Sequence, residues 1–364
     1  MSNHLVLDPG SNTIKCNVAS YIELPEYQIS ATGWQTEQGF VPVQDAKLKK
    51  MPSISNGVIF NSNCFHDLLY HATIKQFGIS RLKNDYLVAL LVPLSWTKSM
   101  LEETAQFMFE VCNFSGLVFL EQPLTTLYGY GNTSGLVLDI GYETCDIAAV
   151  FENVVVRYGS VTLPVGGKDV LRYLEILLLQ DEEFKKVWKS DAIEEKFLKE
   201  ILETPDLIIG IPNGESEATI IEINGIKAPI SAKIRWSCLD VLFDPSKVGK
   251  EVFSLPQALT KCIRDSGEPD RRLFLWENIA LSGGLAAISG IKNRIEVECA
   301  LYLAASETSS EFQAKEVGWL KIPDYFTNFR ERPQDMGYVG GSVTAKCTFL
   351  SPINYITRVS ICFY

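Results

Sequence analysis

Two acidic residues in this chain, Asp8 and Asp139, each end a short apolar run and stand two positions before a glycine. Glycine permits a tight turn in which backbone N–H groups approach an anion closely. The carboxylate can then reach a metal ion or a water held on that anion. A third glycine turn, Ser282-Gly283-Gly284, follows another apolar run. The repeat predicts a duplicated α/β unit that binds a phosphate ligand between two lobes. The two similar segments are Leu5-Val6-Leu7-Asp8-Pro9-Gly10 and Leu136-Val137-Leu138-Asp139-Ile140-Gly141.

The composition excludes several classes of protein. The chain has 364 residues, of which 46% are hydrophobic and 21% are charged, as in a soluble globular protein with room for two lobes. Its net charge of −11 argues against direct binding of nucleic acid. We expect no membrane span and no signal peptide, because no apolar run is long enough. The nine scattered cysteines indicate free thiols, and the three histidines lack the spacing of a zinc site.

The pattern of apolar residues predicts alternating strands and helices. The run of alternating charge at 181–199 indicates a solvated face. In the first part we expect a hairpin at 1–30, a loop or small insert at 31–53, a helix at 63–77, a buried strand at 86–94, a helix at 99–109 opened by a Ser99-x-x-Glu102 capping box, a strand at 117–120, a helix at 124–130 and a hairpin around Glu152-Asn153. Further on we expect a helix at 170–202, a β-rich stretch at 208–234 with a turn at Asn224-Gly225, a helix at 255–263, a helix at 290–303 leading into a strand, and a final helix that begins at Gly340.

Five segments, taken in their order and spacing, resemble the actin family over nearly the whole chain. They match that family's two phosphate loops, the turns between its lobes and its adenosine turn. The resemblance implies an α/β protein with the actin-like ATPase fold, in which two duplicated, ribonuclease-H-like lobes surround a central nucleotide cleft. Sugar kinases and chaperones of the same ATPase fold are the alternative. The segments are 8–15, Asp139-Ile140-Gly141, Gly166-Gly167-Lys168-Asp169, 278–284 and Tyr338-Val339-Gly340-Gly341-Ser342.

The resemblance also implies the domain organisation. The first lobe would comprise 1–129 and 330–364, with a shortened second subdomain at about 30–53. The second lobe would comprise 130–329, with a fourth subdomain at about 166–251. The span between Lys15 and Gly57 is too short to hold actin's full second subdomain, whose loop contacts the next subunit of a filament.

In actins, the residues that match Asp8 and Asp139 hold the waters around the nucleotide's divalent cation. Ser11 and Lys15 match phosphate contacts, and Gln122 matches the residue that positions the attacking water. These are the parts that phosphoryl transfer needs. The candidate cofactor-binding residues are Asp8, Gly10, Ser11, Lys15, Asp139, Gly141, Gly283 and Gly284.

The departures from the actin pattern are as informative. Tyr142 and Glu143 replace an aspartate and a glycine of the second phosphate loop, and Asp146 replaces a histidine. A glutamate beside a polyphosphate adds repulsion, on the order of a few kcal/mol if unrelieved. We therefore predict a vestigial cleft, with no catalytic residue, no metal site and no required cofactor; bound ATP with Mg²⁺ is the alternative. On the adenosine side the departures are Leu285, Ala287, Ile288 and Gln334.

Further segments resemble one branch of the family, the ninth actin-related proteins of fungi, which are subunits of the SWI/SNF and RSC chromatin remodellers. The resemblance implies a nuclear, non-catalytic scaffold subunit. It would pair with a second actin-related protein and bind the helix that precedes the motor's ATPase domain, alongside other subunits. The segment Asp139-x-Gly141-Tyr142 and the run 163–168 also resemble the pointed-end actin-related subunit of dynactin, which stays an alternative, as does an ATP-switched actin-related protein. The branch segments are Ser95-Trp96, Leu101-Glu102, Phe109-Glu110, 276–279, 320–326 and Tyr355-Ile356-Thr357-Arg358.

Actin ligands insert an amphipathic helix into the groove between the two large subdomains at the barbed end. The resemblance places the partner-binding surface of this chain in the same groove. The residues that would line it are Tyr128, Gly131, Thr133, Val343, Thr344, Cys347 and Phe349.

Overall fold

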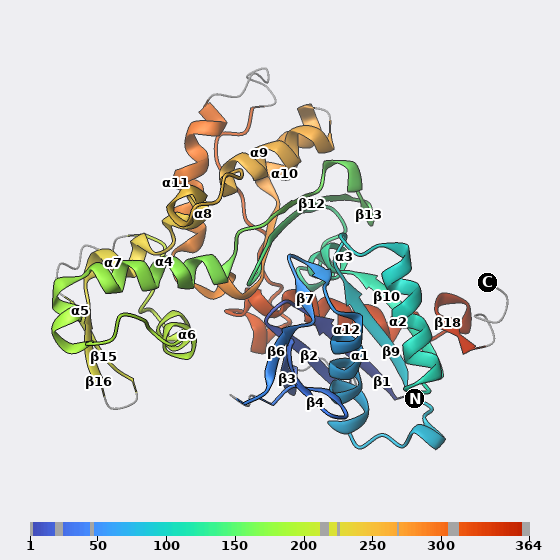
Figure 1. Ribbon diagram of the computed structural model, residues 1–364. Coiled ribbons are helices and arrows are strands. Elements are labelled where there is room, and N and C mark those ends of the chain that lie inside the picture. The colour runs from blue at the N-terminus through green and yellow to red at the C-terminus, as the bar shows by residue number, and fades with distance from the viewer. Residues whose placement is uncertain are drawn as a thin grey trace. The chain divides into compact units, whose positions relative to one another are not determined.

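The computed structural model describes residues 3–18, 25–43, 47–211, 218–223, 226–267, 269–304 and 313–358. The chain forms two compact units, and the mixed α/β architecture expected from the sequence is confirmed (Figure 1). Within the described ranges, no helix is both long and apolar enough to span a membrane, and every cysteine is a free thiol. Unit 1 comprises Met1–Val137, Ala148–Arg157 and Leu320–Tyr364, and unit 2 comprises Leu138–Ile147 and Tyr158–Trp319.

Unit 1 is built on a six-stranded sheet with the strand order β18-β10-β9-β1-β2-β3. The three central strands are parallel, and β2, β3 and β18 are antiparallel to their neighbours. The predicted buried strand is confirmed as β9, in which all six residues are buried. The strands are β1 (His4–Pro9), β2 (Thr13–Val18), β3 (Tyr27–Ser30), β9 (Leu87–Val92), β10 (Gly116–Glu121) and β18 (Ile356–Thr357).

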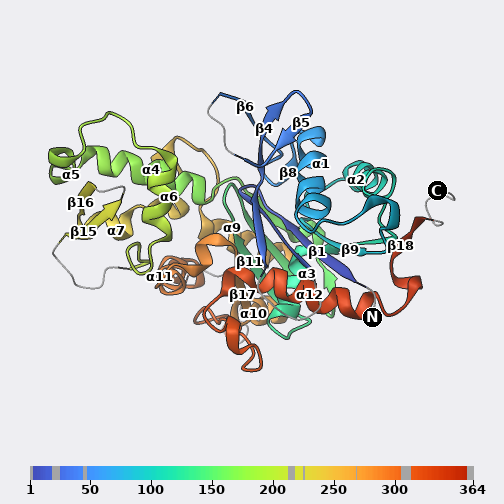
Figure 2. The ribbon, with the colours of Figure 1, turned by 90° about the horizontal axis from the view of Figure 1, so that it is seen from below.

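Helices cover both faces of this sheet, because successive strand residues point to opposite sides. On β1, Leu5 and Leu7 pack into the cluster that contains α1 and α2, whereas Val6 packs into the cluster that contains α12. Figure 2 shows α3 and α12 next to each other beside the sheet. The helices are α1 (Ser62–Tyr70), prolonged by the π-helical His71–Lys75, α2 (Lys98–Glu110), α3 (Gln122–Gly129) and α12 (Met336–Thr348).

The stretch 31–53, expected to be a loop or small insert, is a small insert whose described residues are mostly β-structure, and not a loop. It forms a three-stranded sheet of order β5-β4-β6 that is fixed to α1, since the Phe40 N–H donates to Asp67 at 2.9 Å. Two short strands, β7 and β8, follow. The strands are β4 (Thr32–Thr36), β5 (Gly39–Val41), β6 (Lys49–Pro52), β7 (Ile54–Ser55) and β8 (Val58–Ile59).

The start of α2 differs from the predicted capping box. Thr97 is the N-cap, and its hydroxyl accepts from the Met100 N–H at 3.4 Å. The Ser99 hydroxyl donates to Glu103 instead. Thr97 is the better cap because it stands in extended conformation directly before the first helical residue.

The second sheet has the strand order β13-β12-β11-β17, and β14 pairs with β12. The predicted hairpin at Glu152-Asn153 is confirmed, and both residues have positive φ. The strands are β11 (Gly135–Ile140), β12 (Cys145–Phe151), β13 (Val154–Val155), β14 (Val161–Leu163) and β17 (Ile279–Ser282). A separate hairpin pairs β15 (Thr219–Ile223) with β16 (Ile226–Ile230), and the expected turn at Asn224-Gly225 lies outside the described residues.

Three helices replace the single helix expected at 170–202. Asp181 ends the first of them because it leaves helical conformation, and its carboxylate then caps the second by accepting from the Glu183 and Phe184 N–H groups. The helix expected at 290–303 is found as α11, which runs to Ala304 with no strand before that residue, and the positions that follow directly, 305–312, lie outside the described residues. The helices of unit 2 are α4 (Gly167–Gln180), α5 (Glu182–Val187), α6 (Glu195–Glu203), α7 (Ala232–Ser237), α8 (Asp240–Phe243), α9 (Leu255–Ser266), α10 (Pro269–Glu277) and α11 (Ile291–Ala304).

The final helix begins at Met336, before the predicted Gly340. Gly340 lies inside α12, at the point where α3 crosses the helix. A side chain does not fit there, since a Cβ at Gly340 would stand 1.7 Å from the Thr125 carbonyl oxygen. A Cβ at Gly129 of α3 would likewise stand 2.2 Å from the Met336 oxygen. The two helices therefore meet through their backbones.

Candidate functional site

The first glycine turn joins β1 to β2 and holds Asp8 opposite Lys15, its partner across the two strands. The turn closes through a hydrogen bond from the Gly10 N–H to the Thr13 carbonyl oxygen at 2.9 Å. Ser11 lies within the turn and is half-buried. The four predicted residues of this turn, Asp8, Gly10, Ser11 and Lys15, therefore lie together in unit 1.

Asp8 also contacts Gln122, the first residue of α3. The Gln122 amide donates to an Asp8 carboxylate oxygen at 2.9 Å. Burial raises the pKa of the Asp8 carboxyl, an effect that Lys15 and the Gln122 hydrogen bond oppose. The carboxylate is thus held in place by neighbours within its own unit.

The Lys15 ammonium is bonded to the start of α12. It donates to the Gln334 carbonyl oxygen and to a carboxylate oxygen of Asp335, both at 3.0 Å. The second Asp335 oxygen accepts from Arg332 at 2.8 Å, and the Asp335 side chain is only 2% exposed. Asp335 was missed by the sequence reasoning, because no local motif marks it.

The second glycine turn joins β11 to β12 in unit 2. It closes through a bond from the Gly141 N–H to the Thr144 oxygen at 2.9 Å, and the Gly141 oxygen accepts from the Gly167 N–H at 2.9 Å. A Cβ at Gly166 would stand 2.7 Å from the oxygens of Gly141 and Tyr142. The residues at the start of α4 therefore pack directly against this second glycine turn, called the Asp139 loop below.

The two unusual residues of this loop are both bonded to helices of unit 2. The Tyr142 hydroxyl donates to Glu195 of α6 at 2.7 Å, and the Lys199 ammonium stands 4.8 Å from the centre of the Tyr142 ring. Burial and the Glu195 hydrogen bond raise the pKa of Tyr142. Glu143 accepts from the Lys168 ammonium at 2.7 Å, so its charge, which the sequence suggested could be unrelieved, is paired.

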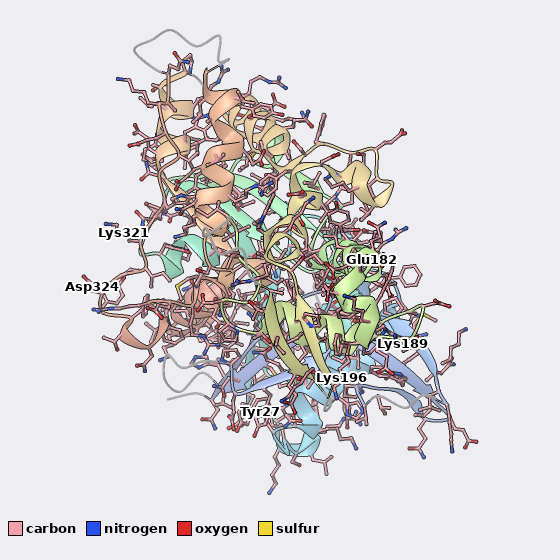
Figure 3. All side chains as sticks on the ribbon, turned by 90° about the vertical axis from the view of Figure 1, so that its left-hand side faces the viewer. Tyr27, Glu182, Lys189, Lys196, Lys321 and Asp324 are labelled. Carbon is pink, nitrogen blue, oxygen red and sulfur yellow. The ribbon has the colours of Figure 1, made fainter. Side chains whose placement is uncertain are left out.

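The contacts of Glu195 and Lys199 modify the prediction for the charge run at 181–199. Much of that run is exposed, and Figure 3 labels Glu182, Lys189 and Lys196 among its side chains. Its last turn instead fastens α6 to the Asp139 loop. No spacing signal in the sequence pairs residues 142 and 195.

Asp146 follows on β12 and stands between two threonines. It accepts from the Thr144 and Thr162 hydroxyls at 2.9 and 2.6 Å. Burial raises the pKa of the Asp146 carboxyl, and the two hydroxyls oppose the effect. Both donors thus serve to hold a half-buried carboxylate in place.

The third glycine turn follows β17 and packs against β11. Gly283 has a φ of +88°, and a Cβ there would stand 2.4 Å from the Ile140 oxygen, so this glycine is required by the fold. A Cβ at Gly284 would meet open space. Leu285 is buried, Ile288 half-buried and Ala287 exposed. Within the described ranges, no group of three or more His, Cys, Asp or Glu residues could hold a metal ion.

The seven residues predicted for the partner groove lie in unit 1 and differ in exposure. Tyr128 is half-buried, and its hydroxyl donates to Asn153 at 3.1 Å. A Cβ at Gly131 would stand 3.0 Å from the Tyr325 hydroxyl oxygen. Phe349 is 8% exposed and packs in the core cluster that contains Val6 and residues of α12, so it offers little surface to a partner. Val343 and Thr344 are half-buried, and Thr133 and Cys347 are exposed.

The sequence reasoning missed two apolar residues that follow α12. Leu350 is 84% exposed and Ile353 is 92% exposed. The sequence could have indicated them, because they are large apolar residues three and six positions after Cys347, in a stretch where a helix ends. Both are therefore exposed apolar residues that directly follow α12 in the chain.

A model of the family described as Actin matches residues 2–205. The chain belongs to the actin family. This confirms the family resemblance and the actin fold.

Several relatives of this chain are actin-related proteins. Actin-related protein 7 of Arabidopsis thaliana is 26% identical over 311 residues, which cover 81% of this chain and 78% of the relative. Actin-related protein 7 of Oryza sativa subsp. indica is 25% identical over 360 residues, which cover 95% and 92%. Actin-related protein 2 of Schizosaccharomyces pombe is 30% identical over 203 residues, which cover 54% and 51%. The resemblance to the ninth actin-related proteins stays a prediction.

Proposed function

We propose that this chain is a non-catalytic, actin-related scaffold subunit of a chromatin remodeller of the SWI/SNF or RSC type. It acts in the nucleus, paired with a second actin-related protein. Together they bind the helix that precedes the ATPase domain of the motor subunit. The resemblance of the branch segments to the ninth actin-related proteins supports this proposal. Two residues of these segments, Trp96 and Phe326, are buried in the structure.

The observation that carries the non-catalytic part is the internal bonding of Lys15. The actin fold implies a nucleotide with a divalent cation, and an ammonium that binds phosphate must direct its N–H groups at phosphate oxygens. Here they are directed at Asp335 and at a backbone oxygen. Glu143 adds a second carboxylate, paired with Lys168, where the family has glycine. These residues do not fit a hydrolytic nucleotide site, and the protein requires no cofactor.

The proposed binding of a partner helix is supported by exposed residues at the end of α12. Val343, Cys347 and the residues just beyond the helix leave apolar groups accessible. An amphipathic helix binds such a surface with apolar anchors at i, i+3, i+4 and i+7. Burying a few large side chains contributes about 1.5–3 kcal/mol each. A second actin-related subunit would add the remaining contacts.

The test is purification of the tagged protein from its native source, with its stoichiometric partners identified by mass spectrometry. We expect a remodeller motor and a second actin-related protein. Dynactin subunits in their place would contradict the proposal and favour the pointed-end alternative, which the Gly141-Tyr142 segment also supports. The same preparation reports location, since nuclear and cytoplasmic fractions are purified separately.

A further inference from the structure

Asp335 stands directly before α12 and yet does not cap it. Its backbone precedes the first helical residue, but its side chain forms no capping hydrogen bond. The two carboxylate oxygens accept instead from Lys15 of β2 and from Arg332. A carboxylate at a helix N-terminus, between two cations, has the electrostatic surroundings of a bound anion.

We propose that Asp335 is a built-in anion that occupies the Lys15 ammonium and so excludes external phosphate from the first glycine turn. A phosphate group would compete for the Lys15 ammonium, which already donates to Asp335 and to the Gln334 carbonyl oxygen. It would also have to displace a carboxylate that is almost fully buried. The turn therefore keeps the residue types of a phosphate loop while its cation is neutralised from within.

The surroundings of Lys15 support this assignment. Two cations, Lys15 and Arg332, face two carboxylates, Asp8 and Asp335, so the group has no excess positive charge. Acceptors are in surplus as well, because the Gln334 side-chain oxygen is buried with no hydrogen-bond partner in the structure. A group without excess positive charge offers a phosphate no net electrostatic attraction.

This inference deepens the non-catalytic part of the proposed function, which rests on the same Lys15 contacts, and is independent of the proposed partner helix. Capture of a partner helix and the response to an anion are separate measurements. If the partner helix bound elsewhere, Asp335 would still neutralise Lys15. If an anion bound the wild-type turn, the partner surface on α12 would be unaffected.

The experiment measures thermal unfolding in increasing inorganic tripolyphosphate, with ionic strength held constant by NaCl. We expect no specific stabilisation of the wild type, because Lys15 is already paired. Asp335→Asn keeps the side chain's size and leaves Lys15 and Arg332 with excess positive charge. Its apparent affinity for tripolyphosphate should rise about tenfold or more. Adding Lys15→Met to Asp335→Asn should abolish the gain.

Two results would overturn the proposal. One is a folded Asp335→Asn protein that responds to tripolyphosphate no more than the wild type does. The other is a wild-type response that Lys15→Met removes, since that would mean the ammonium is available to external anions. The second comparison needs no Asp335 variant, so the proposal stays testable even if Asp335→Asn fails to fold.

Discussion

Tyr142 and Glu143 stand at the second glycine turn, and both side chains are bonded to their own unit. Tyr142 is fastened to α6 through Glu195, and Glu143 is paired with Lys168. Because these contacts use the positions that a phosphate-binding loop leaves open, we predict no ATP hydrolysis above background. The measurement is phosphate release by purified protein with ATP and Mg²⁺.

Asp139→Ala is the matched control for that measurement. Asp139 lies three positions before Tyr142 and is the carboxylate that the family resemblance assigns to the cation's waters. If the chain has no turnover, wild type and Asp139→Ala give the same background rate. Phosphate release that Asp139→Ala abolishes, together with stoichiometric nucleotide in the purified protein, would show a working site.

The residues found from the sequence are those whose chemistry is local to a turn. Asp8 and Lys15 flank one glycine turn, so residue type and spacing sufficed to group them. Asp335 is 320 positions from Lys15, and Glu195 is 53 positions from Tyr142. Only the packing of distant elements brings these carboxylates to the turns, and no spacing in the sequence encodes that.

At the scale of elements, the crossing of α3 and α12 depends on glycines. A Cβ at Gly340 would meet the Thr125 oxygen at 1.7 Å and the Gly129 nitrogen at 2.6 Å, all of them backbone atoms. Backbone cannot yield as a side chain can, so Gly340→Ala must push the helices apart. We predict a loss of about 3 kcal/mol or more in the free energy of unfolding, measured by urea denaturation.

Gly337→Ala tests whether the crossing, and not helix composition, is responsible. Gly337 lies on the same helix, and its Cβ would meet only the Thr126 hydroxyl at 3.2 Å. Alanine favours a helix over glycine by about 1 kcal/mol, so this variant should lose little stability or gain some. Equal destabilisation by both substitutions would contradict the backbone crossing.

Element prediction succeeded where one physical signal dominated. The strand β9 was predicted because all of its residues are apolar, and in the structure all of them are buried. The stretch 170–202 was predicted as one helix because its apolar residues recur at helical spacing. That spacing does not reveal that Asp181 ends α4 and caps α5. The sheet at 31–53 was missed because its strands are short and partly polar, and they are stabilised through Asp67 of α1.

At the scale of the whole molecule, relatives such as actin-related protein 7 of Oryza sativa subsp. indica align with most of the chain at low identity. A match of 25% over 95% of the chain leaves most surface residues free to differ. Partner choice is set on such surfaces, whereas the fold is set by the core. The function must therefore be tested on the surface at the end of α12.

The most direct measurement is capture of the motor's pre-ATPase helix by the purified protein, with its second actin-related partner present. Val343→Asp would place a carboxylate among the apolar groups of the surface, so we predict that capture falls about tenfold or more. Leu82→Asp is the matched control, since Leu82 is 93% exposed and outside that surface, and should leave capture unchanged. Thermal melting verifies that both variants fold. Undiminished capture by folded Val343→Asp would contradict the account.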